Sequence, residues 1–139
     1  MNTAYPYTLE PQEGDGYLVQ FVDFEEAFTE GATEEEAAFN AAEVLSLVIE
    51  QRLADGRSVP LPSLDEGRPV AYPQASAQVA LLLRKAREEQ GRTLAEMARA
   101  LQTSWPSAQR LEQATANPTL KQLERAAAAL GKRLLITLD

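Results

Sequence analysis

Carboxylates, arginines and lysines are the only strongly charged or reactive side chains here, because the 139 residues include no cysteine and no histidine. The chain therefore lacks a thiolate nucleophile, the commonest general base and the commonest zinc ligands. We expect no catalytic site, no metal and no cofactor. Binding chemistry remains: guanidinium and ammonium groups can contact phosphates and bases, and carboxylates can attract a cationic partner.

These charges are divided between the two halves of the chain. Residues 1–75 hold 15 acids and 3 bases, whereas residues 76–139 hold 10 bases and 6 acids. The asymmetry predicts an anionic polymer as partner of the second half and a cationic protein as partner of the first. Two merely solvated faces are the alternative, and charge alone does not separate the two interpretations.

Prolines mark the boundary between the halves. Four of the eight prolines lie at 60, 62, 69 and 73, in a stretch where helix is disfavoured. We interpret 56–69 as a loop and expect two domains, at 1–73 and 76–139.

The first domain has the pattern of a small α+β unit. Apolar residues alternate with polar ones from Tyr5, a Gly-Asp-Gly turn follows, and Thr33 with Glu36 forms a capping box that opens an amphipathic helix. The predicted order is β-β-β-α-β, with strands at 5–10, Tyr17–Val22, Ala27–Thr29 and Val70–Tyr72 and a helix from Thr33 to Leu53.

The second domain is predicted to be helical. Glycines and caps separate four apolar-periodic segments, and an apolar segment, Leu134–Leu138, follows the last of them. The expected helices are Ala77–Gln90, Thr93–Leu101, a third capped by Ser104 and running to about Gln113, and a fourth from Pro118–Thr119 to Leu130. The fold class is therefore α+β, with an all-α helix-turn-helix domain and a C-terminal strand after the first domain.

Residues 76–131 resemble the lambda-repressor/Xre type of helix-turn-helix. The resemblance rests on Thr93 to Ala98 with Leu101, on Ser104 to Ser107 with Arg110 to Glu112, and on Asn117 to Leu120 with Leu123, Ala126 and Leu130. It implies operator DNA as partner and a buried pair of Arg87 with Glu112. The implied DNA-contacting residues are Thr93, Trp105, Pro106, Ser107, Gln109, Arg110, Asn117, Thr119 and Lys121.

Several of these roles have alternatives. Arg110 can bond guanine O6 and N7 together, whereas Trp105 either packs on a thymine methyl or is a partly buried staple. Lys121 either contacts a phosphate or is a solvated helix lysine. Gln102 stands where the family has a turn glycine, and Leu94 stands where it has a glutamine.

The first domain is similar to the HicB antitoxin family. The shared features over residues 4–72 are Gly31-x-Thr33-x-x-Glu36-Ala37 and Pro60-x-Pro62-Ser63. The resemblance implies a truncated RNase H-like fold and a type II toxin–antitoxin role. Its partner would be a HicA-like basic mRNA interferase. The family's usual loop sequence after the second strand is altered here. We place the toxin contact at Asp23, Phe24, Glu25 and Glu26, because these residues flank the end of that strand.

An active nuclease is the less favoured interpretation of an RNase H ancestry. Such an enzyme needs carboxylates that converge on metal ions, and the available acids are Asp15, Asp23, Glu36 and Glu43. Another alternative is a transcription regulator whose first domain senses a ligand or a protein. We expect an antitoxin that neutralises the toxin and represses its own operon.

The C-terminal segment predicts self-association. A terminal strand as apolar as this one exposes unpaired backbone groups unless it pairs, and a helical domain offers no sheet. We expect a homodimer or higher even oligomer through Leu134, Leu135, Ile136 and Leu138; folding back onto the chain itself is the alternative. No signal peptide or membrane span is visible, which predicts a cytoplasmic protein.

Overall fold

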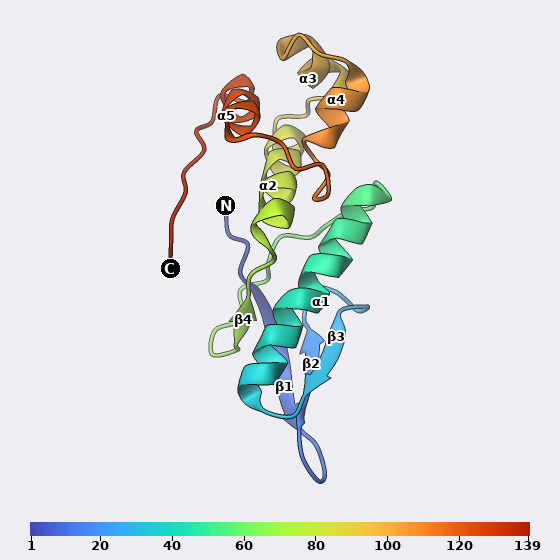
Figure 1. The fold of residues 1–139 in the computed structure, drawn as a ribbon, viewed down its shortest axis with the longest axis vertical. Coiled ribbons are helices and arrows are strands. Elements are labelled where there is room, and N and C mark those ends of the chain that lie inside the picture. Colours follow the sequence, from blue (N-terminus) through green and yellow to red (C-terminus); the bar gives the residue numbers. More distant parts are fainter. The chain divides into compact units, whose positions relative to one another are not determined.

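The computed structural model describes residues 1–139 and divides into two compact units, Met1–Gln78 and Val79–Asp139. This division lies inside a helix, slightly beyond the predicted boundary. The first turn of this helix belongs to the first unit, because Gln78 is bonded to it. Its side chain accepts from the Thr3 hydroxyl at 2.9 Å and donates to the Pro73 carbonyl at 2.8 Å. The elements are β1 (Tyr5–Pro11), β2 (Tyr17–Phe21), β3 (Phe28–Gly31), α1 (Glu34–Ala54), β4 (Val70–Ala71), α2 (Ala75–Glu89), α3 (Leu94–Ala100), α4 (Trp105–Arg110) and α5 (Leu120–Ala129) (Figure 1).

The first unit is an antiparallel sheet with one helix across it, in the predicted β-β-β-α-β order (Figure 1). The strand order is β3-β2-β1-β4, and the register places Tyr7 opposite Phe21 and Val19 opposite Thr29. Tyr7, Val19 and Phe21 are buried, as the period-two pattern predicts for one covered face. Strand β3 begins one residue later than predicted and ends two residues later.

Helix α1 begins at its predicted cap. The Thr33 hydroxyl accepts from the Glu36 backbone N–H at 3.1 Å, which is one half of the expected capping box. Ala37, Ala41 and Leu45 are fully buried. The helix approaches β3 so closely that a Cβ on Gly31 would lie 2.3 Å from the Ala37 nitrogen, so only glycine fits there.

The second unit packs α3, α4, α5 and the C-terminal half of α2 around one apolar core. Its centre includes Leu83, Met97, Ala108, Leu123 and Leu130. Thr93, Ser104 and Thr119 cap α3, α4 and α5. In each case the side-chain hydroxyl accepts a hydrogen bond from the backbone N–H of the residue three positions later. Helix α4 ends at Arg110, earlier than the predicted Gln113, and turns follow it.

The predicted C-terminal strand is not formed within this chain. Residues 132–139 have no regular secondary structure, and only Leu134 packs partly against the helical core. Leu135, Ile136 and Leu138 are 72%, 69% and 98% exposed. The helical unit itself provides no strand with which this segment could pair. No helix of the protein is long and apolar enough to cross a membrane.

Candidate nucleic-acid and protein interfaces

The turn between α3 and α4 is a Schellman motif. The Gln102 N–H donates to the Arg99 carbonyl at 3.1 Å and the Thr103 N–H donates to the Ala98 carbonyl at 2.9 Å. Gln102 has φ 53°, the left-handed conformation that favours glycine. The turn therefore does not avoid positive φ, and Gln102 carries the strain that the family's glycine would relieve.

Helix α4 presents the predicted base-contacting positions at the surface. Trp105, Pro106, Ser107 and Arg110 are exposed and Gln109 is half-buried, whereas Ala108 lies in the core. The Ser107 N–H donates to the Ser104 hydroxyl oxygen at 3.2 Å, so the first turn is already capped. Trp105 is 47% exposed, which fits both a thymine contact and a partly buried staple. This geometry suits a recognition helix, because its base-reading end is unobstructed within its own unit.

The four predicted phosphate-contacting residues are also exposed: Thr93, Asn117, Thr119 and Lys121. Thr93 and Thr119 form complete capping boxes with Glu96 and Gln122. Hydrogen bonds from Thr93 hold the pKa of Glu96 below its ordinary value. Asn117 has φ 56°, which asparagine tolerates better than most residues.

Arg87 and Glu112 form a bidentate, mostly buried ion pair. Arg87 Nε lies 2.7 Å from Glu112 Oε2, and its Nη2 lies 2.9 Å from Oε1. Arg87 also donates to the Arg92 carbonyl at 2.8 Å. The Glu112 hydrogen bond raises the pKa of Arg87. The pair joins α2 to the segment that follows α4. It therefore helps to hold α4 in place relative to α2.

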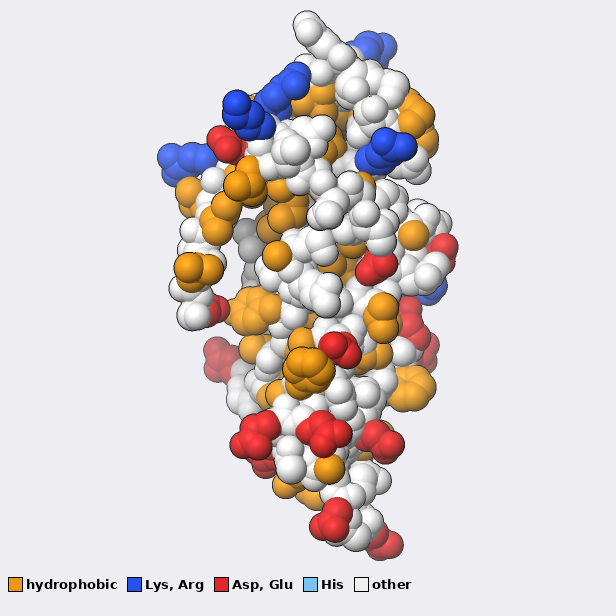
Figure 2. All heavy atoms as spheres, in the orientation of Figure 1, with side chains coloured by type: hydrophobic (Ala, Val, Ile, Leu, Met, Phe, Trp, Pro, Cys, Tyr) orange, Lys and Arg blue, Asp and Glu red, His pale blue; other side chains and the backbone are white.

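Arg125 is a surface cation that sequence reasoning missed. Its guanidinium donates to the Leu101 carbonyl at 3.3 Å, at the C-terminal end of α3. With Thr103, Ser107 and Gln122 it lines a cavity of about 90 Å³ beside the recognition helix. Arg125 follows Lys121 by one helical turn, so the spacing in the sequence already places the two cations on the same face of α5. Figure 2 shows lysine and arginine side chains on the second unit and mainly acidic ones on the first.

The loop after β2 holds the four predicted toxin-contacting residues, but they do not form one acidic surface. Phe24 is fully buried, its ring centroid lies 5.1 Å from that of Tyr5, and the Arg52 guanidinium carbon lies 4.9 Å from the Phe24 ring. Phe24 is therefore a core residue, which corrects the prediction of a partner contact there. Large aromatic side chains gain most from burial, and this one closes the core beneath its loop.

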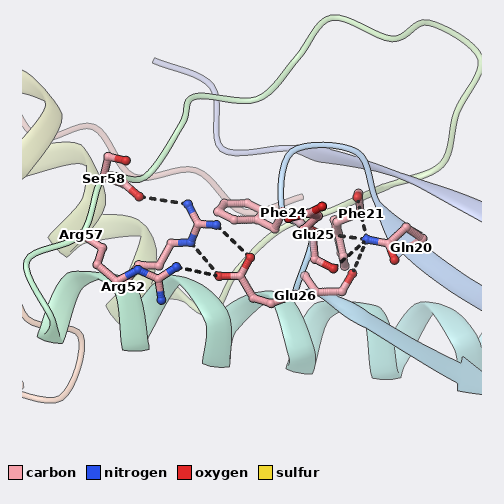
Figure 3. A network of polar contacts seen from close by, with 9 residues as sticks. Gln20, Phe21, Phe24, Glu25, Glu26, Arg52, Arg57 and Ser58 are labelled. Atoms are coloured by element: carbon pink, nitrogen blue, oxygen red, sulfur yellow. Dashed lines mark hydrogen bonds and ion pairs between the residues drawn. The ribbon is translucent and has the colours of Figure 1, made fainter.

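The acids beside Phe24 are bound by the chain itself. Glu26 forms a bidentate pair with Arg52 at 2.8 Å and lies 3.6 Å from Arg57 (Figure 3). The Arg52 hydrogen bonds lower the pKa of Glu26 to about 2. Asp23 accepts from the Ser63 backbone N–H at 3.0 Å and from the Ser63 hydroxyl. Of the three acids, Glu25 alone is exposed without an ion pair or a hydrogen bond to its carboxylate.

Gln20 organises the same loop and was also missed. Its side-chain amide donates to the carbonyl oxygens of Phe21, Phe24 and Ala27 at 3.0, 3.0 and 3.3 Å (Figure 3). One amide thus satisfies several carbonyls of a tight loop. Gln20 therefore holds this loop in a fixed conformation. The charges of Glu26 and Asp23 stabilise the fold through Arg52 and Ser63.

The remaining acids considered for nuclease chemistry do not gather. Asp15 is exposed in the β1–β2 turn, Glu36 lies in the first turn of α1, and Glu43 lies on the exposed side of that helix. No three acids of the chain lie close enough together to hold a metal ion.

Comparison with known proteins identifies both units. The family model described as a HicB-like antitoxin of a bacterial toxin–antitoxin system matches residues 4–77, and a helix-turn-helix domain model matches residues 78–132.

Three curated relatives are similar to this chain. Antitoxin HicB 2 of Photorhabdus laumondii is 33% identical over 96% of this chain and 94% of its own length. Antitoxin HicB 1 of the same organism is 46% identical over 44% of this chain and 39% of its own length. Antitoxin HicB of Escherichia coli is 42% identical over 42% of this chain and 43% of its own length. The chain therefore belongs to the HicB-like antitoxin family of bacterial toxin–antitoxin systems, and its second unit is a DNA-binding helix-turn-helix domain.

Proposed function

We propose that this antitoxin neutralises a HicA-like basic mRNA interferase through its first unit and represses its own operon through its second. The observation that carries the proposal is the uninterrupted succession of a HicB-like antitoxin domain and a helix-turn-helix domain. The alignment with antitoxin HicB 2 supports it over nearly the whole of both chains.

The charge distribution supports the same division of labour. Residues 1–75 carry 15 acids and 3 bases, which favours encounter with a cationic protein. Residues 76–139 carry 10 bases and 6 acids, and Arg110, Lys121 and Arg125 are exposed there for contact with DNA. The role is one of binding and not of catalysis, since the Asp23 carboxylate is held by Ser63 and no three acids gather to hold a metal ion.

The operator-binding form is proposed to be a dimer. Each helix-turn-helix reads one half-site, and two-fold pairing doubles the contacts. The exposed Leu135, Ile136 and Leu138 are the segment through which two copies would pair as strands.

A toxicity-rescue experiment tests the proposal. The small basic reading frame expected beside the gene for this chain is expressed with and without the full chain, and growth is followed. We expect growth arrest by the basic protein alone and recovery with the chain, together with repression of a reporter behind the operon's own promoter. Repression without rescue would contradict the antitoxin role and favour a regulator that senses another signal.

A further inference from the structure

The outer face of α1 carries large apolar side chains. Phe39 is 65% exposed and Leu47 is 64% exposed, and Glu43 lies midway between them. Successive spacings of four place these three residues in one line along the helix. We define this line, Phe39, Glu43 and Leu47, as the α1 stripe.

The inner face of the same helix is buried from its first turns to its last. Ala37 and Ala41 are fully buried, and Leu45 and Ile49 continue the buried row. In its first turns the helix thus directs small alanines inward and a phenylalanine outward. On the outer side of a surface helix polar side chains are the rule, so an exposed phenylalanine and leucine in one line indicate a contact surface there. The sheet covers the inner side, and nothing within the first unit covers Phe39 or Leu47.

Acids surround the exposed apolar side chains. Glu35 and Glu36 are exposed one turn before Phe39, and Glu43 interrupts the stripe. The one base of α1, Arg52, is occupied by Glu26 at 2.8 Å. Hydrophobic and acidic side chains are accordingly intermixed over α1 (Figure 2). The chemistry matches an apolar contact surrounded by cationic groups on a partner.

We propose that the α1 stripe is the surface on which the basic toxin docks, an inference that rests on the proposed function. Charge complementarity selects this occupant. The first unit of a second copy carries 15 acids against 3 bases and would be repelled from this face, and DNA is itself anionic. The basic second unit of a second copy is assigned to DNA under the proposed function. A basic protein gains from both components of the stripe, because Phe39 and Leu47 supply the desolvated anchor and the acids steer its approach.

The test uses the full chain and the purified product of the adjacent basic reading frame with its histidine replaced by alanine. Phe39→Ser combined with Leu47→Ser removes the anchor, and Glu43→Lys reverses the charge. Leu64→Ser and Glu66→Lys are matched controls, because Leu64 is 95% exposed and both residues lie in the loop before β4. Near-ultraviolet circular dichroism of the tyrosines, all four of which lie in residues 1–75, checks that the first unit remains folded.

We expect the double variant to weaken toxin affinity by roughly 30-fold or more, the size of a hot-spot loss. Glu43→Lys should slow association at low salt by about tenfold, and both controls should stay within about threefold of wild type. Equal toxin affinity of wild type and double variant would overturn the inference and leave the proposed function intact. An equal loss of toxin affinity in the two control variants would have the same meaning.

Two further outcomes distinguish other occupants. If the double variant changes only the sedimentation of the free chain, the stripe contacts a second copy and the inference is wrong. Absence of toxin binding by the wild type would overturn the proposed function and this inference with it.

Discussion

At the scale of single residues, the most informative position is Gln102, where a non-glycine residue adopts φ 53° in the turn of the helix-turn-helix. The left-handed conformation costs an L-residue on the order of 1–2 kcal/mol, because Cβ crowds the following carbonyl. The Schellman hydrogen bonds to Ala98 and Arg99 keep the turn in place despite this cost.

Replacing Gln102 by glycine should stabilise the second unit. We expect Gln102→Gly to raise the free energy of unfolding by about 0.5–1 kcal/mol, since the relieved strain exceeds the entropy that glycine loses. Urea unfolding followed by fluorescence of Trp105, the only tryptophan, measures it. Asn117→Gly is the control: its φ is 56°, and asparagine tolerates this region, so its gain should be smaller. A loss of stability at residue 102 would contradict the proposed strain.

Glu26 should make the stability of the first unit depend on acid pH. Its pKa of about 2 in the folded unit lies below the ordinary 4.5, so the ion pair with Arg52 stabilises the fold above about pH 5. This stabilisation is lost progressively as the pH falls from about 5 to 2, because the unfolded chain then binds the proton more readily. Glu26→Gln should therefore unfold more easily than wild type at pH 7, and the two should converge near pH 2.

Tyrosine circular dichroism in urea at several pH values measures that convergence. Glu25→Gln is the matched control, since the Glu25 carboxylate is exposed and has no ion pair, so its replacement should change the stability at pH 7 by less than about 0.5 kcal/mol. A difference between Glu26→Gln and wild type that stays constant from pH 7 to pH 2 would show that the ion pair does not stabilise the fold.

At the scale of elements, the helix-turn-helix depends on the tie between α2 and the segment after α4. Arg87 and Glu112 have side chains only 15% and 10% exposed, and each satisfies the other's charge. Removing one partner of such a pair leaves a buried charge uncompensated.

Glu112→Ala should therefore destabilise the second unit by about 3 kcal/mol, the cost of a broken buried pair. Glu124→Ala, an exposed acid of α5, should change stability by less than about 0.5 kcal/mol. Urea unfolding monitored at Trp105 compares the two. Equal, small effects would mean that the pair contributes nothing to holding α4.

The C-terminal segment gives a second prediction at this scale. Deleting Leu134–Asp139 should convert the chain to a monomer by light scattering, with operator affinity collapsing while toxin binding persists, because strand pairing would bury the exposed Leu135, Ile136 and Leu138. A truncated protein that remains dimeric at micromolar concentration would exclude this interface.

The sequence predicted the elements whose signals are local. Thr93, Ser104 and Thr119 begin their helices as expected, because a cap needs only a backbone N–H three residues on. Local signals did not reveal contacts between distant residues: the Arg87–Glu112 pair came from the family resemblance, and the contact of Glu26 with Arg52, 26 residues away, above the buried Phe24 was not predicted. The C-terminal strand was predicted from the apolar composition of its segment alone. A strand forms only where another strand can pair with it, and composition does not show whether one is present.

At the scale of the whole molecule, two units of opposite charge share one chain. The first carries the α1 stripe beside a loop whose acids Asp23 and Glu26 are held by Ser63 and Arg52, and the second combines the capped helix α4 with exposed arginines. The division predicts that a substitution in one unit's binding surface leaves the other unit's partner unaffected, since additivity holds for distant sites without shared contacts.

The most direct test of this account measures the affinity of one full-length variant, Arg110→Ala, for both partners by isothermal titration calorimetry. Operator affinity should fall by about 1–3 kcal/mol, because the proposed bidentate contact of Arg110 with guanine would be lost in each half-site, while affinity for the proposed basic toxin should equal that of wild type. Unchanged operator binding, or a parallel loss of toxin binding, would contradict the assignment of the two functions to separate units.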